Sequence, residues 1–144
     1  MHYKILLILL LLFSAFVVQA QEAPLTVISN NTGAPPDLKL GALKSILRGE
    51  RQRWPNGAKV VIALMKTNTP VGNSTLKKIY NMSADELNKY WLAMVFQGKA
   101  SAPTFFNSTA DLEAFVAQTP GAIGITTNDS NNVRTITVDG KKAL

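Results

Sequence analysis

Short apolar runs alternate along the chain with segments whose apolar residues recur at helical spacing. Apolar, β-branched runs at 25–30 and 122–126 predict two strands, and the segment VRTITVDG (133–140) predicts a third that ends in an Asp-Gly turn. A fourth run, VVIALM at 60–65, is apolar at every position. Such continuity is typical of a strand that is covered on both faces of a sheet.

Four segments, starting near residues 37, 73–74, 83 and 108–109, have the spacing of amphipathic helices. We expect the second helix to begin at Asn73 or Ser74. For the third, Ser83 and Glu86 form a capping-box pattern, and Gly98 suits the helix end. The expected buried faces, in chain order, are Leu40, Leu43, Ile46 and Leu47; Leu76, Ile79 and Tyr80; Leu87, Tyr90, Trp91, Met94 and Val95; Leu112, Phe115 and Val116.

Strands that alternate with helices predict an α/β fold. We therefore expect a three-layer domain with a central mixed sheet flanked by helices. Trp54 and Trp91 are expected in its core, because large aromatic side chains at such positions usually pack there.

The first twenty residues have the pattern of a secretory signal peptide. A short basic start precedes a continuous apolar run, and Val18-Gln19-Ala20 is a small-x-small cleavage pattern. Cleavage after Ala20 would leave residues 21–144 as one domain, without a lipobox and without insertion in a membrane. An uncleaved anchor is the alternative. We expect a periplasmic or secreted protein.

The composition excludes several kinds of chemistry. The chain has no cysteine, and its one histidine, His2, lies in the predicted signal peptide. Catalytic triads and zinc sites built from histidine or cysteine are therefore excluded from the processed chain. The acidic residues Asp85, Glu86, Asp111 and Glu113 fall in first turns of predicted helices, where the helix dipole favours them. We expect no enzyme, no metal and no cofactor.

The chain is mildly basic. Its formal charge is +6, and loss of Lys4 with the signal peptide would lower this to +5. Such a charge suits small anions or an acidic partner rather than nucleic acid, given export. Arg48, Arg51 and Arg53 form either an anion patch or a solvated helix end.

The stretch KTNTPVGNSTLKK (66–78) is the strongest candidate for a binding site. Hydroxyls of Thr67, Thr69, Ser74 and Thr75 precede or begin the predicted helix, and Lys66 adds positive charge. Hydroxyls and unpaired amides at a helix start can donate hydrogen bonds to an oxyanion. The alternative is that Asn73 or Ser74 only caps the helix.

Several motifs, in this order, resemble those of the periplasmic phosphate-binding protein family. They are Leu47-Arg48-Gly49, Trp54-Pro55-Asn56-Gly57, the run VVIALM, Thr69-Pro70, Tyr90-Trp91 followed by Phe96-Gln97-Gly98, and Pro120-Gly121-Ala122-Ile123-Gly124. The resemblance covers about residues 25–127. It implies one lobe of a type-2 periplasmic binding protein, which normally has two lobes that close on a ligand.

The resemblance also implies roles for individual residues. Family members bind phosphate through an Arg-x-x-x-Ser-Gly-Thr loop on this lobe. Thr69 matches the serine, Pro70 the glycine and Val71 the threonine, while Met65 stands at the arginine with Lys66 beside it. Arginine grips an oxyanion with two parallel hydrogen bonds, which neither methionine nor lysine can do. We therefore expect phosphate affinity weaker than that of full-length members.

Two functions remain open at this stage. The first is an exported substrate-binding-like protein that binds phosphate or a similar oxyanion weakly at 67–75. The tentative ligand-binding residues are then Lys66, Thr67, Thr69, Val71 and Ser74, and an ABC permease or another periplasmic protein is the expected partner. The second is a single-lobe interaction module that has lost the ligand. An isolated lobe could also regain a cleft by forming a homodimer.

Overall fold

The computed structural model describes residues 23–127 and 130–144. The predicted signal peptide and its cleavage site lie outside the described residues. The strands are β1 (Thr26–Ser29), β2 (Asp37–Leu38), β3 (Val61–Met65), β4 (Thr104–Phe106), β5 (Ala122–Thr126) and β6 (Arg134–Val138). The helices are α2 (Leu40–Leu47), α3 (Pro70–Thr75), the π-helical turn η1 (Leu76–Tyr80), α4 (Ala84–Phe96) and α5 (Thr109–Gln118).

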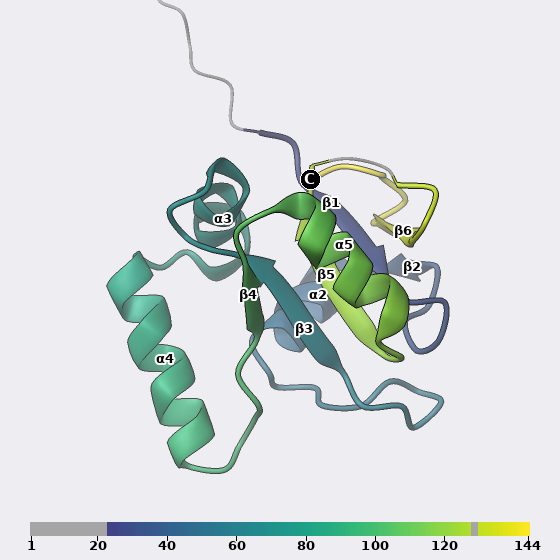
Figure 1. Ribbon diagram of the computed structural model, residues 1–144. Coiled ribbons are helices and arrows are strands. Elements are labelled where there is room, and N and C mark those ends of the chain that lie inside the picture. The colour runs from purple at the N-terminus through teal and green to yellow at the C-terminus, as the bar shows by residue number, and fades with distance from the viewer. Residues whose placement is uncertain (1–22, 128–129) are drawn as a thin grey trace, which may run out of the picture.

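The strands form one mixed sheet in the order β2-β6-β1-β5-β3-β4 (Figure 1). β3 is parallel to both of its neighbours, with Ala63 opposite Gly124 of β5 and opposite Thr104 of β4. β1 is antiparallel to β5 and β6. The predicted α/β fold with a central mixed sheet is therefore confirmed.

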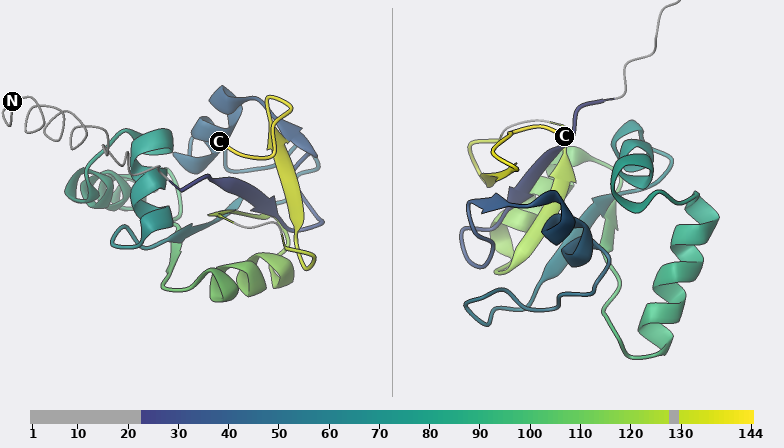
Figure 2. Two further views of the ribbon diagram at one scale, coloured as in Figure 1. Left: turned by 90° about the horizontal axis from the view of Figure 1, so that it is seen from above. Right: turned by 180° about the vertical axis from the view of Figure 1, so that it is seen from behind.

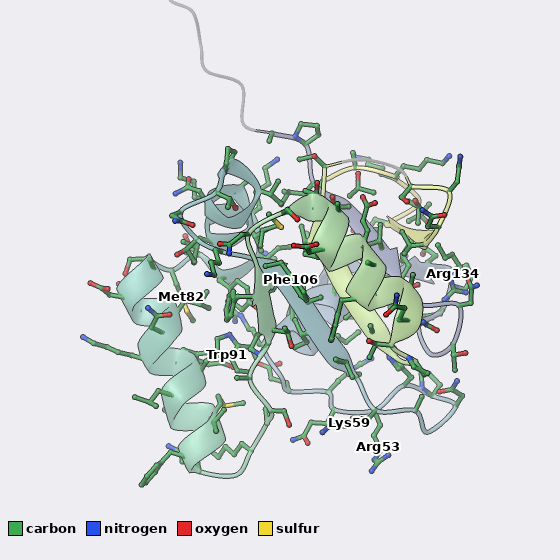
Figure 3. All side chains as sticks on the ribbon, viewed as in Figure 1. Arg53, Lys59, Met82, Trp91, Phe106 and Arg134 are labelled. Carbon is green, nitrogen blue, oxygen red and sulfur yellow. The ribbon has the colours of Figure 1, made fainter. Side chains whose placement is uncertain are left out.

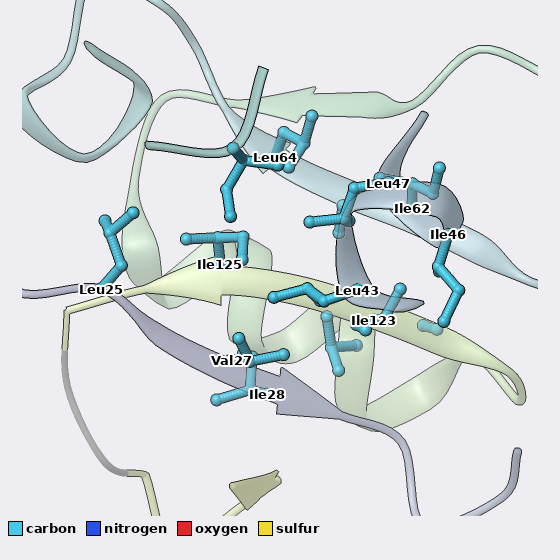
Figure 4. Close-up of a cluster of buried hydrophobic side chains, with 14 of the residues drawn as sticks. Leu25, Val27, Ile28, Leu43, Ile46, Leu47, Ile62, Leu64, Ile123 and Ile125 are labelled. Carbon is cyan, nitrogen blue, oxygen red and sulfur yellow. The ribbon is translucent and has the colours of Figure 1, made fainter. Parts of the chain in front are cut away.

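Helices cover both faces of this sheet. Figure 1 shows α5 in front of the sheet, and the view from behind in Figure 2 shows α2 across the opposite face. The α2 side chains Leu43 and Leu47 point toward Leu64 and Ile125 of the sheet (Figure 4). All four are essentially inaccessible to solvent. Burial on this scale is the main source of stability in a chain without disulfides.

Several predictions from the apolar pattern are confirmed. Trp54 and Trp91 are both buried, and the capping box of Ser83 and Glu86 is formed at the start of α4. Gly98 follows that helix with a positive φ of 67°. Leu76, Ile79 and Tyr80 are all buried, as their spacing predicts.

Other predictions were wrong in instructive ways. The helix expected from Asn73 or Ser74 begins at Pro70, because Thr69 caps it and proline fits the first helical position. Strands β2 and β4 were not predicted, since each is at most three residues long. Val95 of α4 was expected in the core but is 46% exposed.

The helix α4 lies at the periphery, beyond the edge strand β4, in both Figure 1 and Figure 2. Of its thirteen residues only Leu87 and Trp91 are buried. Trp91 lies on the side of α4 that faces the body of the domain (Figure 3). Its ring packs so closely on the turn at Gly49 that a Cβ there would lie 3.1 Å from ring carbons. The Tyr90 hydroxyl donates to the Arg48 carbonyl oxygen beside this contact.

Candidate functional site

The candidate loop follows the carboxyl end of β3. Lys66 to Thr69 leave the strand there, and α3 begins at Pro70. The loop is anchored by the Lys66 amide, which donates to the Phe106 carbonyl oxygen of β4 at 2.9 Å. In open α/β sheets, ligands bind outside the carboxyl ends of parallel strands. The candidate segment therefore lies at the edge of the sheet where such folds bind ligands.

Thr69 is the N-cap of α3. Its hydroxyl donates to the Lys66 carbonyl oxygen at 2.6 Å and accepts from the Gly72 amide at 3.0 Å. The Thr69 carbonyl oxygen accepts from the Asn73 amide at 2.9 Å. The hydroxyl and two of the amides that could have served an anion are therefore already paired within the loop. The capping interpretation holds for Thr69 rather than for Asn73 or Ser74.

Val71 and Ser74 belong to the packed side of the loop. Both are buried, at 7% and 5% exposure. The neighbouring Thr75 hydroxyl donates back to the Val71 carbonyl oxygen at 2.8 Å. These positions therefore support the short helix, and the structure does not bring them together with Lys66 on an accessible surface.

Lys66 and Thr67 are the two predicted site residues that line an open pocket. Asn88 of α4 and Phe105 of β4 complete its lining, and its volume is about 210 Å³. The pocket thus combines an ammonium group, a hydroxyl and a primary amide above an aromatic wall. Asn88 and Phe105 were missed from the sequence. The only signal was the short run Thr-Phe-Phe after Pro103, which is too brief to identify as a strand.

Met65 is buried at 5% exposure at the end of β3. The family resemblance places the arginine of a phosphate loop at this position. Here the side chain is part of the core, so the loop lacks that fork and Lys66 is its only cation. A lysine ammonium acts on an oxyanion as a point charge.

Comparison with solved structures identifies proteins that share this fold. A protein from Clostridium perfringens, described as a phosphate ABC transporter substrate-binding protein and solved with bound phosphate, superposes with a TM-score of 0.65 at 16% identity, over 83% of this chain and 46% of its own. An ABC-type phosphate transport receptor from Vibrio cholerae gives 0.64 at 13% identity, over 81% and 46%. PstS from Borrelia burgdorferi gives 0.61 at 17% identity, over 82% and 48%.

The chain has the fold of one lobe of a phosphate-binding protein. It spans a little under half the length of each of these proteins. The first two are described as proteins of phosphate transport. No protein-family model matches the sequence, and no curated protein does. At identities this low, the similarity establishes the shared fold and leaves the ligand to separate arguments.

A buried hydroxyl lies near the same edge of the lobe. Thr126 ends β5, two residues beyond Gly124, which pairs with Ala63 of β3. Its side chain is fully buried, and its hydroxyl has no hydrogen-bond partner among the described residues. The sequence analysis did not select Thr126, because a threonine at a strand end is ordinary.

Tyr80 fixes the helical segment that follows the loop. Its hydroxyl donates to the Leu47 carbonyl oxygen of α2, and Arg48 donates to the Tyr80 carbonyl oxygen at 3.3 Å. Burial of the phenol raises the pKa of Tyr80 above its usual range. The side chain thus stays neutral and joins η1 to the end of α2. Arg48 therefore stabilises the end of α2. Arg53 donates to the Gly57 carbonyl oxygen of its own turn at 2.9 Å.

The described part of the lobe offers no cluster of three or more acidic, histidine or cysteine side chains suited to a metal ion. Within residues 23–127 and 130–144, no helix has the length and apolar character needed to cross a bilayer.

Proposed function

We propose that this protein is an exported, binding-protein-like lobe that binds phosphate or a similar oxyanion weakly, at the open pocket lined by Lys66 and Thr67. The observation that supports this most directly is the place of Lys66. It is the one cation of the loop that follows β3, and it faces a pocket with further hydrogen-bond donors in Thr67 and Asn88. The lobes that share this fold come from proteins of phosphate transport.

Weak binding follows from what the pocket lacks. It is open to solvent, and its charge is a single exposed ammonium. An exposed ion pair is worth about 0–1 kcal/mol, because water screens it. The loop's best-placed hydroxyl, that of Thr69, is engaged in the helix cap. The site therefore contacts an anion without enclosing it.

Export, an uptake role and an ABC permease partner belong to this proposal as well. The apolar leader predicted at residues 1–20 supports export. The chain spans about half of each protein it resembles, so the proposed oxyanion contacts are those of one lobe.

The alternative function is a single-lobe interaction module without a ligand. One observation favours it: the outer side of α4 exposes Leu92 and Phe96, at 71% and 91%. A protein with this function would leave phosphate unbound at every concentration.

The two functions are separated by an NMR titration of the exported, purified protein with inorganic phosphate. We expect amide shifts around Lys66 and Thr67 that are lost in Lys66→Gln. The matched control is Lys142→Gln, which removes the same charge from an exposed site elsewhere. Equal shifts in both variants, or none in the unmodified protein, would refute the oxyanion site.

A further inference from the structure

A second open pocket lies near the opposite edge of the sheet from the candidate oxyanion site. Its volume is about 350 Å³, and it is lined by the start of α2, by η1 and by the end of β6 with the segment after it. The oxyanion pocket, by contrast, borders β4 at the other edge. Pockets that hold small molecules have volumes of about 300–1,000 Å³ and mostly apolar walls. The apolar side chains of this pocket are Leu40, Ile79, Val138, Ala143 and Leu144.

One wall of the pocket is the segment that follows β6, which Figure 2 shows in yellow turning back after the strand. The turn begins at Asp139, whose φ is 50°. Across this turn, Val138 and Lys141 exchange two backbone hydrogen bonds of 2.8 and 3.0 Å. Farther along, the Leu144 amide donates to the Leu25 carbonyl oxygen at 2.9 Å. The segment is therefore held at both ends, which gives the pocket a fixed wall.

Three charged residues line the same pocket: Lys78, Lys141 and Asp139. Lys78 is half-buried, and its ammonium donates to the backbone oxygen of Leu144 at 3.0 Å. Its position is thus fixed, and its aliphatic stem adds to the apolar lining. Lys141 and Asp139 are exposed. Two ammonium groups against one carboxylate leave a net positive charge, which favours an anionic ligand.

We propose that this pocket binds a small monocarboxylate with an apolar body, of the chemical class of a medium-chain fatty acid. The apolar body lies against Leu40, Ile79 and Ala143, and the carboxylate lies near the ammonium groups of Lys78 and Lys141. Each methylene group that leaves water strengthens binding about fourfold. The apolar walls thus supply most of the affinity, and the lysines select the sign of the charge.

The combination of apolar walls and positive charge weighs against other small ligands. Inorganic phosphate has no apolar body and would meet only ammonium groups that water screens. An apolar amine would be repelled by the two lysines. This pocket shares no lining residue with the oxyanion pocket of Lys66 and Thr67. Either proposal can therefore fail alone.

The first test is an NMR titration of the exported, purified protein with hexanoate. We expect amide shifts at Ile79 and Ala143 and a Kd on the order of 1 mM. Butanoate, which is two methylene groups shorter, should bind about tenfold more weakly. The uncharged 1-hexanol should bind about fivefold more weakly, because it lacks the contact with the lysines.

Three results of this titration would overturn the proposal. The first is the absence of shifts at the pocket, including the case in which shifts occur only around the exposed Leu92 and Phe96 of α4. The second is equal affinity for hexanoate and 1-hexanol. The third is displacement of hexanoate by inorganic phosphate, which would make the pocket a simple anion site.

The second test changes the charge of the pocket in both directions. Lys141→Gln should weaken hexanoate binding by about threefold, and Asp139→Asn should strengthen it by a similar factor. Asparagine tolerates the positive φ of this position. The matched control is Lys142→Gln, at an exposed neighbouring residue that does not line the pocket. Equal weakening in Lys141→Gln and Lys142→Gln would reduce the effect to net charge and overturn the proposal.

The third test fills the pocket. Ala143→Phe places a ring in its volume at an exposed position, and should weaken hexanoate binding about tenfold or more. Ala110→Phe, at an exposed position of α5, is the matched control and should bind like the unmodified protein. Circular dichroism confirms that both variants are folded. Unchanged affinity in a folded Ala143→Phe variant would refute the pocket as the binding site.

Discussion

The hydroxyl of Thr69 donates a hydrogen bond of 2.6 Å to the backbone carbonyl oxygen of Lys66. The same hydroxyl accepts from the Gly72 amide, so that it closes the loop and caps α3 at once. The residue that the family resemblance assigns to the ligand thus stabilises the loop. In the proposed site, the ligand contacts come instead from Lys66 and Thr67, which line the open pocket.

The substitution Thr69→Ala distinguishes a role of Thr69 in stability from a role in ligand binding. Loss of the cap should reduce the free energy of unfolding by about 1 kcal/mol, and phosphate affinity should stay within about twofold, as the hydroxyl is already engaged. Denaturant unfolding and phosphate titration measure the two effects. Thr67→Ala is the matched control, with the reverse pattern: stability within about 0.5 kcal/mol and weaker phosphate binding. Loss of phosphate binding in Thr69→Ala, with unchanged stability, would show that Thr69 contacts the ligand.

Gly72 is required because the backbone of Lys66 passes close to its Cα. A Cβ at this position would lie 1.9 Å from the Lys66 carbonyl oxygen, which is backbone and cannot move aside without opening the loop. We expect Gly72→Ala to destabilise the protein by about 3 kcal/mol or more.

Gly41 in α2 is the matched control for this substitution, because a Cβ there meets nothing within 4 Å. Gly41→Ala should stabilise the protein by roughly 0.5–1 kcal/mol, since alanine is the better helix former. Thermal unfolding of the two variants side by side measures the contrast. Similar transition temperatures for both would show that the loop tolerates a side chain at Gly72.

Tyr80 makes stability sensitive to alkaline pH. Burial raises the pKa of Tyr80 in the folded protein, whereas in the unfolded chain the phenol ionises near pH 10. Its contribution to stability is therefore full below about pH 10 and is lost as the pH rises toward the folded-state pKa. At neutral pH, Tyr80→Phe should cost about 1 kcal/mol through the lost hydrogen bond to Leu47.

Phenylalanine does not titrate. The difference in free energy of unfolding between the unmodified protein and Tyr80→Phe should therefore become smaller above about pH 10. Guanidinium unfolding at a series of pH values provides the measurement. A gap that stays constant through this range would mean that Tyr80 ionises alike in the folded and unfolded states.

The sequence allowed the central strands and the main helices to be predicted because their apolar patterns are continuous. Strands β3 and β5 are apolar at nearly every position, and the buried pairs Leu43–Leu47 and Leu112–Val116 follow helical spacing. The alternation of strands and helices predicted an α/β fold, but the antiparallel pairing of β1 with β5 and β6 was not predicted from it. The edge strands β2 and β4 could not be predicted, since two or three residues carry no period.

Only two of the predicted site residues line the pocket, and whether that pocket binds a ligand stays a prediction. Lys66 and Thr67 line the pocket. Val71 and Ser74 are buried, and the Thr69 hydroxyl caps α3. The difference arises from the start of α3. A cap at Thr69 with Pro70 next to it begins the helix earlier than the apolar pattern indicates, and this directs Val71 and Ser74 inward. Asn88 could not be selected, because its place in the pocket depends on where α4 packs.

The most direct test of the account is the affinity of the exported protein for inorganic phosphate at low ionic strength, measured by NMR titration. An open pocket with one exposed ammonium predicts a Kd on the order of 1 mM or weaker. It also predicts that the shifts centre on Lys66 and Thr67 and disappear with Lys66→Gln. A Kd in the micromolar range or tighter, or shifts that persist in Lys66→Gln, would contradict the account and show that the lobe encloses its ligand.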